Sequence, residues 1–159
     1  MPADAMARSP AMRLLDAYLD LAASTGASDL HLEPGENGLL VRMRVDGRLR
    51  RLEPPPPALI DALRTRARLL AGVDLADRRV PQDGRFEFRA GNRTIDVRAA
   101  FIPVYGGEKI TLRLLDRSGP GLSLDELGLT AEQAAALRRA TAASGGMIVV
   151  CGPTGAGKT

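Results

Sequence analysis

The sequence predicts a compact α+β domain that is followed by the first part of an α/β domain. Segments with the apolar spacing of helices alternate with strand-like segments over most of the chain, and Ser118–Gly121 form a Ser/Gly/Pro-rich break. Beyond it, the apolar run Met147–Cys151 precedes a glycine-rich loop. We therefore expect a disordered tail at residues 1–10, a first domain at 11–117, a linker at 118–128 and the start of a second domain at 129–159.

Composition narrows the class of protein. The 159 residues are 45% hydrophobic and 26% charged, which is typical of a globular chain. No stretch approaches the roughly 18 apolar residues of a membrane-spanning helix, and the N-terminus lacks the apolar core of a signal peptide, so we expect a cytoplasmic location. One cysteine and one histidine exclude an internal disulfide and a cysteine-cluster zinc site. The net charge of +3 comes with only 3% aromatic residues, so no direct nucleic-acid partner is expected.

The first domain begins with a predicted helix and a predicted hairpin. Apolar residues over Ala11–Ala23 recur at the i, i+3, i+4 spacing of an amphipathic helix. Strand-like runs follow at Asp29–Leu32 and Leu39–Val45. Asp46-Gly47 is a dipeptide favoured between antiparallel strands, so the second run should form a hairpin with Arg48–Leu52.

A second helix and three more strands complete this domain. Pro54–Pro57 cannot continue a strand, because proline donates no ladder hydrogen bond, but prolines suit the start of a helix. Leu59–Leu70 carry the apolar stripe of that helix, and Gly72 is placed to end it. Alternating polar and apolar residues then predict strands at Arg85–Arg89, Arg93–Ala99 and Lys109–Leu115.

The second domain begins with a helix and a buried strand. Thr130 begins the predicted helix, and Gly145-Gly146 ends it. Met147–Cys151 have the uninterrupted apolar character of a strand that is buried on both faces of a parallel sheet. Cys151 is accordingly expected to be a small core residue.

The loop after this strand carries the strongest chemical signal. It matches the phosphate-binding pattern G-x-x-x-x-G-K-[ST] with Gly152, Pro153, Thr154, Gly155, Ala156, Gly157, Lys158 and Thr159. Glycines let consecutive backbone amides point at phosphate oxygens, Lys158 would contact the β- and γ-phosphates, and the Thr159 hydroxyl would bind Mg²⁺. The alternative is a glycine-rich turn that carries a lysine by accident. The preceding apolar run opposes that alternative, as does the position of one of only two lysines.

Phosphoryl transfer needs more than this loop. It also needs an acidic residue that holds the metal and a group that orients the attacking water. Both should lie farther along a longer chain, so we expect the fragment itself to be inactive and to bind nucleotide poorly.

Several short segments follow one another in a specific order along the chain. They are Ala27–Pro34 (ASDLHLEP), Val41–Gly47 (VRMRVDG), Arg79–Arg85 (RVPQDGR), Ile95–Arg98 (IDVR), Gly107–Asp116 (GEKITLRLLD) and the phosphate loop. With them the chain resembles, over about Leu14–Thr159, the hexameric ATPases that drive type II secretion and type IV pilus assembly. This ordered set is far more specific than the loop motif alone.

The resemblance implies a fold, a cofactor and partners. The fold would be a PAS-like N-terminal domain joined to a RecA-like ATPase domain, assembled as a homo-hexamer at the inner face of the cytoplasmic membrane. ATP with Mg²⁺ would be bound, and the partners would be an inner-membrane platform and cytoplasmic docking proteins of a secretion or pilus system. In such relatives, arginines of the N-terminal domain reach the terminal phosphates. The matching positions are Arg85, Arg98 and Arg113.

The residues themselves support two interpretations of these arginines. Each alternates with the apolar positions of its strand, so Arg85, Arg98 and Arg113 should share the polar side of the sheet or its edge. A guanidinium fork suits a phosphate and stabilises charge that develops on it. The alternative is an ordinary solvated strand face.

His31 and the basic residues of the predicted hairpin also have two interpretations each. His31 with Asp29 resembles a metal pair, but two ligands are too few, and we expect a structural histidine. A basic set on the predicted hairpin forms either a solvated face or a patch for lipid or a partner, and its members are Arg42, Arg44, Arg48, Arg50 and Arg51.

The sequence departs from the family's pattern at two places, and it is compatible with three functions. Val104–Gly107 stand where relatives commonly have a threonine-containing loop, and Ala156 replaces a frequent serine. The functions are a secretion or pilus assembly motor, a retraction or DNA-uptake motor of the same superfamily, and a non-catalytic nucleotide-sensing scaffold. The segments around Arg85 and Lys109 favour assembly over retraction.

Overall fold

The computed structural model describes residues 9–36, 38–116 and 123–152. The chain divides into two compact units, Met1–Gly119 and Pro120–Thr159. The limits predicted for the tail, the linker and the two domains stay a prediction.

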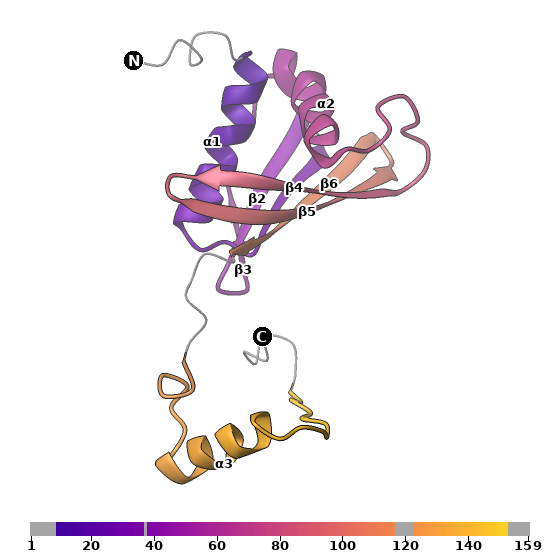
Figure 1. Ribbon diagram of the computed structural model, residues 1–159. Coiled ribbons are helices and arrows are strands. Elements are labelled where there is room, and N and C mark those ends of the chain that lie inside the picture. Colours follow the sequence, from indigo (N-terminus) through magenta and orange to yellow (C-terminus); the bar gives the residue numbers. More distant parts are fainter. Residues whose placement is uncertain (1–8, 37, 117–122, 153–159) are drawn as a thin grey trace. The chain divides into compact units, whose positions relative to one another are not determined.

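The first unit is an antiparallel sheet with two helices on one of its faces (Figure 1). Its six strands have the order β3-β2-β1-β6-β5-β4, so that β1 and β6 lie in the middle of the sheet. This mixture of helices and an antiparallel sheet confirms the predicted α+β class. Along the chain the elements are α1 (Pro10–Ser24), β1 (Asp29–Gly35), β2 (Gly38–Val45), β3 (Arg48–Arg51), the 3₁₀ turn η2 (Pro57–Leu59), α2 (Ile60–Ala71), β4 (Gln82–Ala90), β5 (Arg93–Val104) and β6 (Gly107–Asp116).

One face of the sheet is buried under the helices. Apolar side chains alternate with polar ones along β2 and β5, because successive strand residues point to opposite faces. Leu15 and Leu19 of α1 and Leu63 of α2 are fully buried in the same core as these apolar side chains. Burial of each large apolar side chain contributes about 1.5–3 kcal/mol. Most polar side chains on the opposite face of the sheet are partly or fully exposed, whereas Asp29 on that face is buried.

Turns and helix ends follow the residues predicted for them. Asp46 and Gly47 have φ angles of 50° and 76°. Two consecutive left-handed residues match the right-handed twist of the flanking strands, so the predicted hairpin of β2 and β3 is confirmed. Gly72 ends α2 in the left-handed conformation, with φ 68°.

The strands on the β4 side are longer than the sequence predicted. β4 begins at Gln82 and pairs from its first residue, opposite Phe101 of β5. β5 continues to Val104, which pairs with Gly107 across a two-residue turn. Glycine and proline near these strand ends interrupt the alternation of polar and apolar residues, so the sequence pattern predicted shorter strands. In the structure, pairing with the neighbouring antiparallel strand continues through these residues.

The second unit contains the helix α3 (Ala131–Thr141). Thr130 caps it, and the Gln133 side chain reaches back to the Thr130 backbone N–H at 2.9 Å, which completes a capping box. This confirms the predicted helix start at Thr130, but the helix ends at Thr141, before the predicted Gly145-Gly146.

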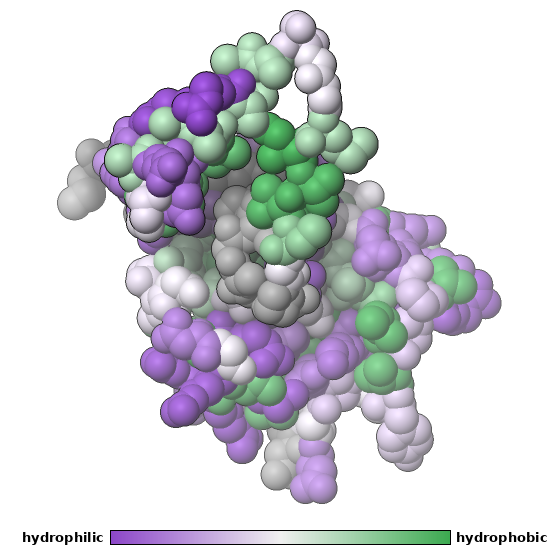
Figure 2. Space-filling model, turned by 90° about the horizontal axis from the view of Figure 1, so that it is seen from below, coloured by the Kyte–Doolittle hydropathy of each residue, from purple (hydrophilic) through white to green (hydrophobic). Residues whose placement is uncertain are grey.

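The buried strand predicted for Met147–Cys151 is wrong in this structure. The segment has no strand conformation, and Met147 and Val149 are 86% and 68% exposed. A strand needs a neighbour to complete its hydrogen bonds, and the described part of the second unit contains no other strand. Cys151 is exposed, so its predicted core role is wrong as well. Figure 2 shows strongly hydrophobic residues gathered at the molecular surface.

Among the described residues, no helix combines the length and the apolar character needed to cross a membrane.

Candidate functional site

The three arginines singled out in the sequence lie in one row across the open face of the sheet. Arg85 of β4 pairs with Arg98 of β5, and Arg98 pairs with Arg113 of β6. Their strand neighbours Val97, Ala99, Leu112 and Leu114 point into the core and are buried. The prediction that the arginines share the polar side of the sheet is therefore confirmed, and we call Arg85, Arg98 and Arg113 the arginine row.

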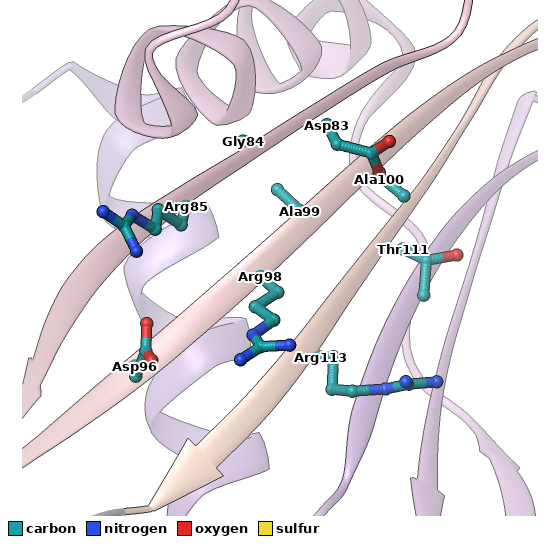
Figure 3. A pocket seen from close by; sticks show the side chains of 9 residues that line it. All are labelled: Asp83, Gly84, Arg85, Asp96, Arg98, Ala99, Ala100, Thr111 and Arg113. Carbon is teal, nitrogen blue, oxygen red and sulfur yellow. The ribbon is translucent and has the colours of Figure 1, made fainter.

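The arginine row borders a hollow of about 710 Å³ on the sheet surface (Figure 3). The small residues Gly84, Ala99 and Ala100 also line it, so no bulky side chain at these positions fills the space. The other lining residues are Asp83, Asp96 and Thr111. A concave surface with three guanidinium groups and two carboxylates has an excess of positive charge, which suits an anionic ligand of phosphate type.

The three arginines differ in the hydrogen bonds and ion pairs that their side chains make. Arg85 and Arg98 are exposed and make no hydrogen bond or ion pair within the described ranges 9–36, 38–116 and 123–152. Arg113 donates from Nε to the Oδ1 atom of Asp29 at 3.1 Å. Because Asp29 and Arg113 are also a cross-strand pair of β1 and β6, this contact extends the arginine row into the centre of the sheet.

Asp29 is a buried carboxylate at this central position, with 6% of the residue exposed. Ser28 donates its hydroxyl to Oδ2 at 2.7 Å, and Arg44 Nε lies 3.6 Å from the same oxygen. Burial alone would raise the pKa of Asp29, but the hydrogen bonds from Ser28 and Arg113 outweigh it and hold this pKa below 3.8. The carboxylate is therefore ionised at neutral pH.

His31 lies beside the arginine row on the same face. Its Nδ1 atom is 3.3 Å from the Thr111 hydroxyl, and its Nε2 atom is buried without a partner. Burial lowers the pKa of His31 below 6.5, against the opposite effect of Asp29 and Glu33. The described residues contain no cluster of three or more acidic, histidine or cysteine groups that would hold a metal ion. The structural role expected for His31 stays a prediction.

A second ion-pair cluster continues this face of the sheet. Glu33 of β1 pairs with Lys109 of β6 at 2.8 Å and also forms a close ion pair with Arg42 of β2. Burial would raise the pKa of Glu33, but hydrogen bonds from Lys109 and Arg42 keep it below its usual value. Arg42 and Arg44 are thus engaged in ion pairs within the sheet, whereas Arg48, Arg50 and Arg51 of β3 are exposed at its edge.

Gly84 brings α2 close to the arginine row. A Cβ atom at this position would lie 2.3 Å from the Ala71 carbonyl oxygen and 2.9 Å from Val73. The glycine in the segment Arg79–Arg85 is therefore required for close packing between the end of α2 and β4. This packing fixes β4, and with it Asp83 and Arg85, at the edge of the hollow.

Sequence reasoning missed Arg68, which supports the loop before β4. Its side chain is fully buried, forms an ion pair with Glu108 and lies 5.3 Å from the centre of the Phe101 ring. It also donates to the backbone carbonyls of Asp74 and Asp77, at 3.0 Å from Nε and 2.9 Å from Nη2 respectively. Arg68 therefore ties the loop of residues 73–81 to the core.

Gln82, the first residue of β4, closes the same loop. Its side chain accepts from the Asp74 backbone N–H at 2.9 Å and donates to the Asp77 carbonyl at 2.5 Å. The segment that leads to Arg85 is thus held from both sides, by Arg68 and by Gln82.

The predicted phosphate loop lies almost wholly outside the described residues. Gly152 is described and exposed, whereas the predicted ligands Pro153, Thr154, Gly155, Ala156, Gly157, Lys158 and Thr159 are not described. Their roles toward ATP and Mg²⁺ stay predictions.

Comparison with known proteins defines the class to which this sheet and loop motif belong. The family described as "Type II/IV secretion system protein" matches residues 4–159. The chain is 42% identical over 151 residues to "Type II secretion system ATPase E" of Vibrio cholerae and 42% identical over 151 residues to "Type II secretion system protein HxcR" of Pseudomonas aeruginosa. The chain belongs to the type II/IV secretion system protein family, which confirms the resemblance seen in the sequence.

The chain corresponds to only part of these relatives. The matches cover 95% of this chain but 30% of the Vibrio cholerae protein and 32% of the Pseudomonas aeruginosa protein.

Two solved structures share the fold. The pilus retraction motor PilT with bound ADP superposes with a TM-score of 0.53 at 23% identity, over 74% of this chain and 33% of PilT. The Yersinia pseudotuberculosis ATPase DotB gives 0.52 at 22% identity, over 79% of this chain and 36% of DotB. At these identities the likeness is one of fold alone.

Proposed function

We propose that this chain is the front part of a motor ATPase that hydrolyses ATP to power type II secretion or type IV pilus assembly. Its first unit would be the PAS-like N-terminal domain, and its second unit the start of a RecA-like domain that carries the phosphate loop. The Vibrio cholerae relative, which is named as a type II secretion ATPase, favours this function. The remaining catalytic groups would belong to the part of the protein beyond these 159 residues.

The arginine row is the observation that carries the proposal. Arginines from three neighbouring strands line one open hollow, and two of them have no partner in the described part of the chain. Like charges on neighbouring strands repel one another, so a bound polyanion would stabilise the row. The terminal phosphates of ATP are an anion of this kind, and they develop further charge during transfer.

The residues present fit ATP and Mg²⁺ by their chemistry. Lys158 and the backbone amides of the phosphate loop would hold the β- and γ-phosphates, and the Thr159 hydroxyl would be a ligand of Mg²⁺. The bound metal supplies charge neutralisation at the phosphates. Arg85, Arg98 and Arg113 would reach the same phosphates when the two units close on the nucleotide, and would stabilise charge on the γ-phosphate.

ATP turnover by the full-length protein tests the proposal. Lys158→Ala should reduce kcat by at least about 100-fold, and Arg98→Ala should reduce it by about 10- to 1000-fold, because each removes charge stabilisation from the transferred phosphate. Arg89→Ala is the matched control, since Arg89 is an exposed arginine of β4 outside the hollow. It should leave kcat unchanged within about twofold. Unchanged turnover in Lys158→Ala would refute the loop assignment.

ATP turnover, together with restoration of secretion or pilus assembly in a deficient strain, separates this function from its alternatives. A nucleotide-sensing scaffold would bind ATP without turnover in the full-length protein. A retraction or DNA-uptake motor would hydrolyse ATP but would fail to restore secretion or pilus assembly in a strain that lacks its own assembly ATPase.

Assembly and location are part of the proposal. We expect the full-length protein to form a homo-hexamer at the inner face of the cytoplasmic membrane, in contact with an inner-membrane platform and cytoplasmic docking proteins. Mass measurement in solution with and without ATP and Mg²⁺ would show the ring, and a monomer under both conditions would contradict it.

A further inference from the structure

We propose that Asp29 is a positioning residue that presets the direction of the Arg113 guanidinium in the arginine row. This inference rests on the proposed function, because the preset guanidinium would be one of those offered to the phosphates of ATP.

The contact uses only one side of the guanidinium. Arg113 donates from Nε to Asp29 Oδ1, and the bond joins residues that are 84 positions apart in the sequence. Arginine has five N–H donors, and the two terminal nitrogens carry four of them. Asp29 therefore fixes the plane of the group without using the terminal edge, and 64% of the Arg113 side chain remains exposed. A phosphate could still bind at this edge.

Asp29 is itself held firmly enough to orient a partner. Only 9% of its side chain is exposed, and it lies on β1, in the middle of the sheet. The Ser28 hydroxyl donates to its second oxygen, and Arg44 Nε of β2 lies 3.6 Å from that oxygen. A carboxylate fixed by its surroundings can fix a flexible side chain, because less conformational entropy remains to be lost on binding.

The geometry of the row explains why Arg113 needs such a partner. Arg98 and Arg113 are directly paired across β5 and β6, where like charges are unfavourable. In Figure 3 the Arg113 side chain extends away from Arg98 and from Arg85. Asp29 is the carboxylate bonded to it there. The row thus consists of two unpartnered guanidiniums and one whose direction is set in advance, which lowers the cost of organising the site around a phosphate.

Steady-state ATP turnover of full-length variants tests the inference. Asp29→Asn keeps the size of the side chain and removes its charge, and it should lower kcat about tenfold with KM for ATP changed less than about twofold. Arg113→Lys keeps the positive charge but has no Nε–H, so it should give a similar loss. In the background of Arg113→Ala, Asp29→Asn should cause no further loss, because it acts through Arg113.

Arg89→Ala is the matched control. Arg89 is an exposed arginine of β4 that lies outside the hollow, so its removal should leave kcat within about twofold. Thermal unfolding of every variant accompanies the kinetics. Arg113→Lys changes an exposed side chain and should keep the melting temperature within a few degrees.

Three results would overturn the inference. The first is independent losses from Asp29→Asn and Arg113→Ala that add in the double variant. The second is faster turnover in Asp29→Asn, which would mean that Asp29 restrains Arg113 from the phosphate. The third is a lower melting temperature in Asp29→Asn with full kcat in Arg113→Lys, which would mean a purely structural pair. If Lys158→Ala abolishes turnover in the same experiment, each of these results leaves the proposed ATPase function intact.

Discussion

Arg68 is a charged residue in the position of a core residue. It lies on the apolar side of α2 next to Ala67, and it is completely buried. Its guanidinium is compensated by Glu108, which follows 40 residues later, and by carbonyl groups of the loop that leads to Arg85. One residue thus connects the helix, the centre of the sheet and the segment beside the candidate site.

Replacement of Arg68 should be strongly destabilising. In Arg68→Ala, Glu108 stays buried without its cation, and the Asp74 and Asp77 carbonyls lose a donor. We expect the free energy of unfolding to fall by about 3–5 kcal/mol, measured by urea denaturation. Arg89→Ala, at an exposed position, should change it by less than about 0.5 kcal/mol. A loss below about 1 kcal/mol in Arg68→Ala would contradict the role assigned to the buried pair.

His31 should make stability depend on pH in the mildly acidic range. Burial lowers its pKa in the folded protein, so below pH 6.5 the unfolded chain binds a proton that the folded chain does not. The stability contribution of neutral His31 is therefore present above pH 6.5 and is lost as the pH falls toward the lowered pKa. Urea denaturation at pH 7.5 and 5.5 should show a smaller difference for His31→Gln than for the unchanged protein. An equal difference in both would contradict this.

Alternation along the strands was enough to predict the face on which the arginines lie, because strand periodicity is a local property. The contacts of Asp29 and Arg68 were not predictable in this way. Their partners are 84 and 40 residues distant, and only the strand order brings β1 beside β6 and α2 beside the β5–β6 hairpin. The unpartnered Nε2 of His31 likewise depends on what covers it, which the sequence pattern does not contain.

At the scale of elements, the contact between α2 and β4 determines where the edge of the hollow lies. Gly84 has an ordinary backbone conformation, so its importance comes from space alone. The end of α2 approaches so closely that a single methyl group would collide with the Ala71 carbonyl oxygen. The strand predicted from the sequence begins only at Arg85, whereas the structure places Gly84 inside β4.

Gly84→Ala should both destabilise the fold and disturb the site. The methyl group forces α2 and β4 apart, so we expect a loss of about 1–3 kcal/mol in the free energy of unfolding and a lower kcat in the full-length protein. Gly35→Ala is the matched control, since an added Cβ at Gly35 would have its nearest neighbour at 3.6 Å, an ordinary contact. Equal effects of the two substitutions would contradict the steric explanation.

At the scale of the whole molecule, the two units differ in how completely they bury their apolar residues. The core cluster of the first unit is formed only by its own residues, from Leu15 to Leu114. In the second unit, Ala134 is the only buried hydrophobic residue described, and Met147–Val150 are exposed. The buried strand predicted for Met147–Cys151 is not formed, because a sheet needs partner strands and the described part of the second unit contains none.

The first unit should therefore fold without the second. A fragment of residues 1–119 should unfold cooperatively at the same melting temperature as the first unit in the 159-residue chain. The longer chain should bind more of a hydrophobic dye and aggregate sooner, because Met147–Val150 are exposed. Val149→Lys in the longer chain should reduce both effects. A melting temperature several degrees lower for the fragment would show that the first unit depends on the second.

The register of the arginine row also limits where insertions and deletions can occur in these strands. Arg85, Arg98 and Arg113 are aligned through two hairpins whose strands are paired up to their short turns. A codon gained or lost inside one strand would turn one arginine from the open face into the core. Insertions or deletions keep the three arginines aligned only if they fall in the turns, or if both strands of a hairpin change length together. The spacing between these arginines along the sequence is therefore set by the lengths of the two hairpins.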